Sequence, residues 1–74
     1  VISGNLDVNG TLTITDGQLR LDTNNPDVNT AGNVTIGTNG SITKGSGTWT
    51  FDGTTTYTDN STTGPQNLGT VEVN

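Results

Sequence analysis

Residues 4–22 read GNLDVNGTLTITDGQLRLD, and this stretch decides the fold class of the chain. Apolar residues occupy every second position in three short runs, which are separated by Asn9-Gly10 and Asp16-Gly17. Successive side chains of a β-strand point to opposite faces, so each run predicts a strand with one apolar and one polar face. Asn-Gly and Asp-Gly pairs supply the positive φ angles of tight turns. The stretch therefore predicts three short strands joined by turns.

The same alternation extends through the whole chain, and no window shows the spacing of an amphipathic helix. We therefore expect an all-β fold whose alternating apolar residues point inward. The expected inward residues are Leu6, Val8, Leu12, Ile14, Leu19, Leu21, Val34, Ile36, Ile42, Trp49, Phe51, Val71 and Val73.

The spacing of these strands predicts a β-solenoid, also called a β-helix. The pair Leu12 and Ile14 recurs as Val34 and Ile36, and the aromatic pair at positions 49 and 51 recurs at the same distance as valines 71 and 73. A strand and its turn take about seven residues, and three such units make a coil of about 22 residues, which is typical of solenoid repeats. A small β-sandwich is the alternative architecture.

A second self-similarity has a longer period. GNLDV at 4–8 matches GNVTI at 32–36, and related matches indicate a coil of roughly 28–30 residues. The longer coil requires inserted loops at DTNNPDVNTA (22–31) and NSTTGPQ (60–66). Both coil lengths stay open at this point.

The composition limits what the isolated chain can do. The chain has 74 residues, is 26% hydrophobic and lacks cysteine, so neither a large core nor disulfides can hold it together. Its net charge is −5 with Arg20 and Lys44 as the only cations, which argues against binding to nucleic acid. No apolar run is long enough to span a bilayer, so we expect no membrane insertion.

We expect residues 1–74 to form a single all-β module. The sequence begins VISGN, without an initiator Met or a signal peptide. The module is therefore expected to be one repeat or subunit of a longer extracellular assembly.

Little in the sequence supports catalysis. The chain contains no His and no Cys, which excludes the usual catalytic triads. Carboxylates such as Asp16, Asp52 and Asp59 are expected at exposed turn edges. We expect no enzyme activity and no cofactor.

The loop DTNNPD contains the strongest metal candidates, Asp22, Asn24, Asn25 and Asp27. Calcium prefers hard oxygen ligands of this kind. Asx residues in a Pro-containing loop are also ordinary turn formers, so we expect no metal requirement and keep the four residues as weak calcium candidates.

Asn9, Asn33, Asn39 and Asn60 each begin an Asn-X-Ser/Thr sequon. They are candidate N-glycosylation sites, which require a surface position.

Threonine alternates with Trp49 and Phe51 in GSGTWTFDGTTTYTDN (45–60). Repeated Thr-x-Thr pairs can form an ice-binding face, but threonine is also an ordinary outward residue of any strand. Asp7 and Arg20 interrupt the row, so we do not expect the Thr-x-Thr pairs to repeat at one fixed register. The alternation places the aromatic residues inside rather than on a sugar-binding surface.

The segments GNLDVNGTLTI, GNVTIGTNGSIT and SGTWTFDGTTTYTD resemble the β-helical repeats of large microbial surface proteins, including adhesins and autotransporter-like passengers. The resemblance covers most of the chain and lies in composition and alternation. It implies structural or adhesive work outside the cell, and it carries no functional residue over to this sequence.

We expect a structural subunit or repeat of an extracellular filament, cell-surface fibre or adhesin, whose partners are copies of itself or adjacent repeats. Open strand edges invite pairing, and neither end of the sequence shows a polar capping segment. Assembly contacts are expected at Val1, Ile2, Ser3, Thr70, Val71, Glu72, Val73 and Asn74. The alternative function is an extracellular binding module for ice, carbohydrate or calcium.

Overall fold

The computed structural model describes residues 2–62 and 64–74. Its strands are β1 (Leu6–Val8), β2 (Leu12–Leu21), β3 (Val28–Thr30), β4 (Val34–Lys44), β5 (Thr48–Phe51), β6 (Tyr57–Asp59) and β7 (Thr70–Val73). The described residues contain no helix, which confirms the expected all-β fold. They accordingly include no helix that could cross a membrane.

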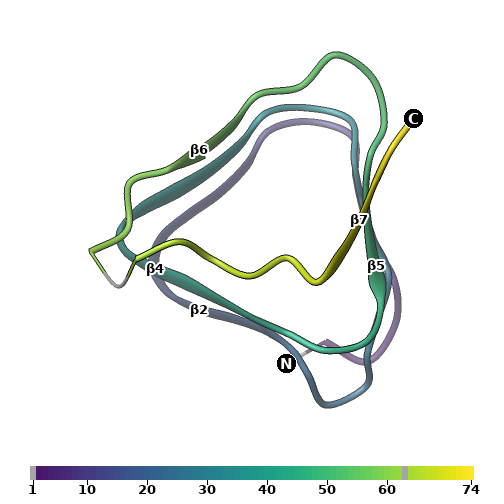
Figure 1. Cartoon of the computed structure of the whole chain (residues 1–74), viewed down its shortest axis with the longest axis horizontal. Helices are drawn as coiled ribbons and strands as arrows, with labels where there is room; N and C mark the ends of the chain where they lie inside the picture. Colours follow the sequence, from purple (N-terminus) through teal and green to yellow (C-terminus); the bar gives the residue numbers. More distant parts are fainter. Residues whose placement is uncertain (1, 63) are drawn as a thin grey trace.

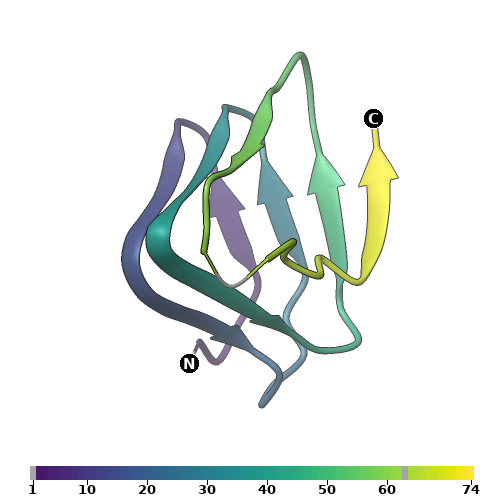
Figure 2. The same ribbon diagram turned by 60° about the vertical axis from the view of Figure 1, so that its left-hand side comes forward.

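The strands form two parallel sheets that wind into a β-solenoid of about three turns. One sheet has the order β1-β3-β5-β7, and Figure 2 shows its four strands side by side and pointing the same way. The other sheet has the order β2-β4-β6. Together the coils have a triangular outline (Figure 1). The predicted solenoid is confirmed, and the sandwich alternative is wrong, since a sandwich of hairpins has antiparallel pairs.

The pairing register decides the coil length. Leu6 pairs with Val28, and Val28 pairs with Trp49. Each of these residues is therefore separated from the next by one full coil of the solenoid. On the other sheet, Val34 pairs with Tyr57. These steps confirm the shorter coil of about 22 residues, and the longer period is wrong.

The first loop that the longer period required does not exist as such, because residues 22–31 contain β3. Val28 and Thr30 of this strand are buried and continue the core of the coils on either side. The segment 60–66 carries no strand among its described residues, as expected.

β2 and β4 are long because each turns a corner without ending. Their register shifts between Ile14 and Asp16, and such a bulge bends a strand. The Asp16-Gly17 pair lies inside β2, with Gly17 at a φ of 98°, and Asn39-Gly40 lies inside β4. Both pairs are therefore bends within continuous strands. For Asp16-Gly17 the sequence had predicted a turn between two separate strands, and this prediction is wrong.

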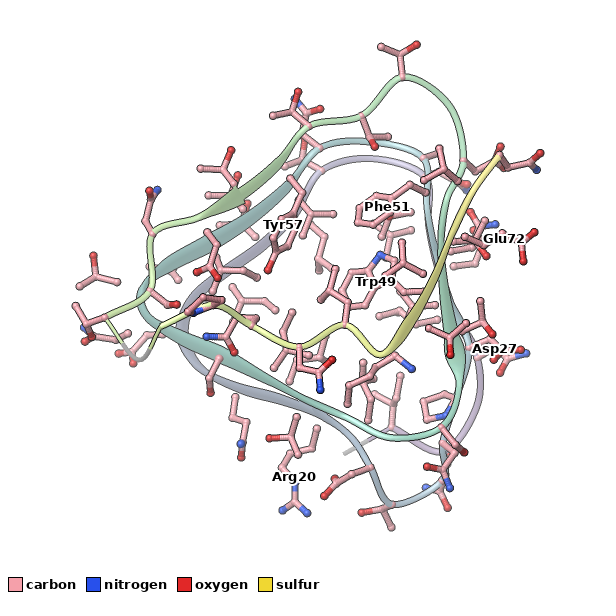
Figure 3. All side chains as sticks on the ribbon, viewed as in Figure 1. Arg20, Asp27, Trp49, Phe51, Tyr57 and Glu72 are labelled. Carbon is pink, nitrogen blue, oxygen red and sulfur yellow. The ribbon has the colours of Figure 1, made fainter. Side chains whose placement is uncertain are left out.

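The core is stacked along the solenoid axis. Its buried apolar residues are Leu21, Val28, Val34, Ile36, Ile42, Trp49 and Phe51. The rings of Trp49 and Phe51 stack with centroids 6.1 Å apart inside the coil (Figure 3). Thr30 is fully buried as well, and its Oγ1 accepts a hydrogen bond of 3.2 Å from Trp49 Nε1, which satisfies both polar groups.

The sequence correctly predicted the buried core residues other than Val28 and Thr30. Apart from the buried Leu21, the predicted inward residues of the first coil are half-buried, because only one neighbouring coil covers them. They are Leu6, Val8, Leu12, Ile14 and Leu19. Val71 and Val73 also occupy inward positions, as predicted, but they are exposed because no further coil among the described residues covers them.

Corners of adjacent coils are in direct backbone contact. A Cβ at Gly32 would lie 2.3 Å from the carbonyl oxygen of Gly10, so this approach requires glycine. Side chains also connect the corners: Asp27 N donates to Asn5 Oδ1 at 2.9 Å, and Thr48 N donates to Asp27 Oδ1 at 2.8 Å. These bonds extend the parallel ladder into the corners and hold the coils in register.

Candidate functional site

The candidate functional site is the end surface of the solenoid, beyond its last coil. Val71 and Val73 of β7 pair with Trp49 and Phe51 and therefore lie on the core side of the sheet. Their exposed fractions are nonetheless 46% and 77%. We call this surface the C-terminal face. On the side of β7 it is an uncovered apolar core.

The opposite side of the C-terminal face is polar. Ile14, Ile36 and Asp59 occupy one inward column, so a carboxylate follows two isoleucines. In the same way Lys44 follows the buried Leu21. Charged side chains thus end two of the inward columns of the β2-β4-β6 sheet, whereas the column of Leu12 and Val34 ends in Tyr57 and that of Leu19 ends in Ile42.

Asp59 is held by the segment that follows β6. Its carboxylate accepts hydrogen bonds from Ser61 N at 3.0 Å, Ser61 Oγ at 2.6 Å and Gln66 N at 2.9 Å. These bonds stabilise the ionised form and lower the pKa of Asp59 from its ordinary value. Asp59 ends β6, as a turn-edge residue does, but its carboxylate is bonded within the protein, which the sequence did not predict.

The same segment covers the free edge of β4. Gln66 Oε1 accepts a hydrogen bond of 2.8 Å from Ile42 N, which is the position that a strand carbonyl would take. Thr62 N donates to Thr38 O at 3.1 Å. We call residues 60–62 and 64–69 the closing loop; its later part crosses inside the outline of the coils below (Figure 1). The C-terminal face therefore has a capping segment on one side, contrary to the expectation from sequence; it covers β4 with polar groups and packs Leu68 against the core.

Tyr57 lies between the apolar and the polar side of the face. Its ring contacts Phe51 edge-on at a centroid distance of 6.3 Å, and Figure 3 shows it pointing into the coil. Its hydroxyl is buried and has no hydrogen-bond partner among the described residues. Burial, with a smaller contribution from the Asp59 charge, raises the pKa of Tyr57.

An open hollow of about 380 Å³ lies on this part of the face. Its lining residues are Tyr57, Asp59, Ser61, Gly64, Pro65 and Gln66. The alternation in TYTD placed Tyr57 and Asp59 on one face, which was the signal for this cluster in the sequence.

Lys44 also faces the closing loop. Its Nζ donates a hydrogen bond to the carbonyl oxygen of Gly47, and its Cγ would lie 3.0 Å from a Cβ at Gly69. The side chain thus lays its methylenes against the closing loop and places its charge on a backbone oxygen.

A second surface is the outer face of the β2-β4-β6 sheet. Thr13 pairs with Thr35, and Thr35 pairs with Thr58, so three threonines stand in one column along the axis. Beside them, Thr56 N donates to Asn33 Oδ1 at 2.9 Å. The middle coil has Asn33 before Thr35 and Gly37 after it, so a single threonine column forms and no Thr-x-Thr pair repeats at one register, as the sequence indicated.

The structure places the four weak calcium candidates around one corner, and each has a partner within the protein. Asp22 pairs with Arg20 at 3.1 Å, which lowers the pKa of Asp22. Asn24 Nδ2 donates to Ile2 O at 3.0 Å, and Asn25 Oδ1 accepts from Ser46 N at 2.9 Å. Asp27 Oδ1 accepts from a corner amide, as described above. Among the described residues, no group of three His, Cys, Asp or Glu side chains could hold a metal ion.

The four sequon asparagines are exposed. Asn33 differs from Asn9, Asn39 and Asn60 in that its Oδ1 accepts a backbone hydrogen bond from the next coil. The aromatic candidates for sugar stacking, Trp49 and Phe51, are in the core.

The predicted assembly residues lie at opposite ends of the solenoid. Thr70–Asn74 form or follow β7, which is an edge of its sheet, and they are exposed. Ile2 packs against the core and Ser3 is exposed, both before β1 at the other edge. Val1 lies outside the described residues.

No family model, curated protein sequence or solved structure matches this chain. The two ends of the solenoid and the threonine column are the features of this chain that bear on function.

Proposed function

We propose that this chain is a structural module of an extracellular filament, surface fibre or adhesin. It is non-catalytic, and it associates along the solenoid axis with a copy of itself or with an adjacent repeat. The observation that carries the proposal is the exposure of Val73 at a core position, at 77%. A coil stacked on the C-terminal face would remove this apolar surface from water, which favours association.

The geometry of the two ends supports the same proposal. β7 and β1 are the edges of one parallel sheet, and unpaired strand edges are templates for further pairing. The acidic composition without cysteine and the resemblance to microbial surface repeats favour the extracellular setting.

Val73→Asp tests the proposal. Val73 is already exposed in the single chain, so aspartate should leave the fold intact while placing a charge in the stacking surface. We expect concentration-dependent assembly of the unmodified chain, seen by sedimentation and as filaments by negative-stain microscopy, and its loss in the variant.

The matched control is Thr35→Asp, which adds the same charge on the outer face of the middle coil. It should assemble like the parent, and circular dichroism should show β-structure in both variants. A parent chain that remains monomeric at high concentration would contradict the proposal.

The column of Thr13, Thr35 and Thr58 favours one second candidate, a binding module of the ice-binding kind. Parallel strands space such hydroxyls about 4.8 Å apart along the axis, which produces a regular array. Thr35→Tyr would break the array, and Thr50→Tyr would leave it intact on the other sheet. Loss of ice-growth inhibition in the first variant alone would support this candidate, and absence of inhibition in the parent would reject it.

A further inference from the structure

The two sides of the C-terminal face differ, and this difference directs any stacking. On the β2-β4-β6 side, Asp59 and the closing loop occupy the inward and edge positions. On the β7 side, Val71 and Val73 leave the core uncovered, and the β7 edge is free of any further strand in the described residues. The β7 side is therefore the surface that a stacked coil would use.

A second copy of this chain fits that surface in one register. The columns Leu6–Val28–Trp49 and Val8–Thr30–Phe51 continue to Val71 and Val73, with one coil between successive members. One further step along the axis places Leu6 of a second copy on Val71 and its Val8 on Val73. The half-buried Leu6 and Val8 of the second copy would thereby gain the cover that they lack on this sheet.

The same register brings two carboxylates together. Asp7 pairs with Asn29, Asn29 with Thr50, and Thr50 with Glu72, so these residues form one outward column. Figure 3 shows Glu72 on the outside of the coil. In the next step Asp7 of a second copy lies opposite Glu72, about 4.8 Å away between adjacent strands.

We infer that the chain self-associates head to tail through β7 and β1, with Val71 on Leu6 and Glu72 opposite Asp7, and that the repulsion between these two carboxylates limits the association at neutral pH. The inference rests on the proposed function and specifies its contact. Like charges directly opposite on neighbouring strands are destabilising.

Among the residues that the structure describes, neither Asp7 nor Glu72 forms an ion pair. Lys44 reaches Gly69 at the start of β7, but its Nζ donates its hydrogen bond to the carbonyl oxygen of Gly47. β5, which pairs with β7, has Thr48 and Thr50 on its outer face, and the exposed Asp52 that follows β5 adds a further negative charge beside the contact. The flanks of Asp7 carry Asn5 and Asn9, which are neutral.

Glu72→Gln tests the charge effect at pH 7. The variant should assemble at a concentration roughly two- to fivefold lower than the parent, which corresponds to the usual strength of one cross-strand pair. Asp7→Asn should act similarly. Asp52→Asn removes the same charge from a position beside the contact and should have a smaller effect. Equal effects of Glu72→Gln and Asp52→Asn would show general charge repulsion and overturn the inferred pair.

Cysteine cross-linking tests the register, because the chain has no cysteine of its own. In the double variant Asp7→Cys with Glu72→Cys, the Cα atoms of adjacent copies lie within disulfide range. Within one chain the two positions are three strand spacings apart, about 14 Å, so an intramolecular bond is excluded. Oxidation should therefore give a ladder of covalent multimers.

The control pair is Asn9→Cys with Glu72→Cys, which lies two residues out of register, about 8 Å apart, and should give no ladder. Assembly without cross-linking of Asp7→Cys and Glu72→Cys, or equal cross-linking of the control pair, would overturn the register and leave the proposed function standing. Absence of assembly in the parent and in all variants would overturn both.

Discussion

At the scale of single residues, Tyr57 and Thr30 show two outcomes for a polar group inside the solenoid. Thr30 is fully buried and its Oγ1 accepts a hydrogen bond from Trp49, so the buried indole N–H is satisfied. The Tyr57 hydroxyl is buried and has no hydrogen-bond partner among the described residues. Burial of an unpaired polar group costs free energy, so the two sites should respond differently to substitution.

Tyr57→Phe should therefore preserve the free energy of unfolding at neutral pH or raise it by up to about 1 kcal/mol. Burial raises the pKa of Tyr57 in the folded protein. The tyrosine of the unfolded chain therefore ionises at a lower pH than that of the folded protein. The stability of the parent should then fall as pH rises above about 10, and the variant should lack this part of the loss. Urea unfolding at pH 7 and at pH 11 measures both effects. A variant clearly less stable than the parent at pH 7 would show that the hydroxyl has a partner.

At the scale of elements, the corners hold the coils together as much as the strands do. The approach of Gly32 to Gly10 leaves no space for a side chain, and Asp27 joins two neighbouring coils through its amide and its carboxylate. Such contacts fix the rise of each coil on the next and hence the stacking of the core residues.

Gly32→Ala should destabilise the protein by about 1–3 kcal/mol, because its Cβ would meet the carbonyl of Gly10 at 2.3 Å. The matched control is Gly10→Ala, whose Cβ would have no atom within 4 Å and whose φ is not positive. We expect the control to unfold within about 0.5 kcal/mol of the parent. Denaturant midpoints compare the two variants, and equal midpoints would contradict the close corner contact.

At the scale of the whole molecule, the solenoid is held by a shared core, parallel ladders and bonded corners. The oxygens of Asp22, Asn25 and Asp27 already accept hydrogen bonds from the protein. They are therefore partly occupied in the absence of any ion.

We accordingly predict that chelation of calcium leaves the thermal midpoint unchanged. The measurement is a melting curve by circular dichroism with and without excess chelator, and with added calcium as the opposite condition. A rise in midpoint with calcium that is lost in Asp22→Asn and in Asp27→Asn would instead establish the loop 22–27 as a calcium site.

The sequence by itself determined that the fold is all-β and which face of each strand points inward. It limited the coil length to two alternatives. Period-two alternation reports which face of a strand is apolar, and this holds for Ile36 and Trp49 without further information. Tertiary structure alone decided the register, because the chain contains several similar corners and only backbone pairing distinguishes them. In the structure, two pairs of short apolar runs join into the long strands β2 and β4, and β3 forms within residues 22–31, which the longer coil had required to be a loop.

Tertiary structure also decided the character of the C-terminal face. Alternation places Val73 and Asp59 on the core side, but whether another coil covers a core position depends on what stacks next along the axis. The capping role of Gln66 arises from one side-chain contact with β4, 24 residues away in the chain. Local sequence patterns report the direction of a side chain, whereas contacts between coils are set by the winding of the whole chain.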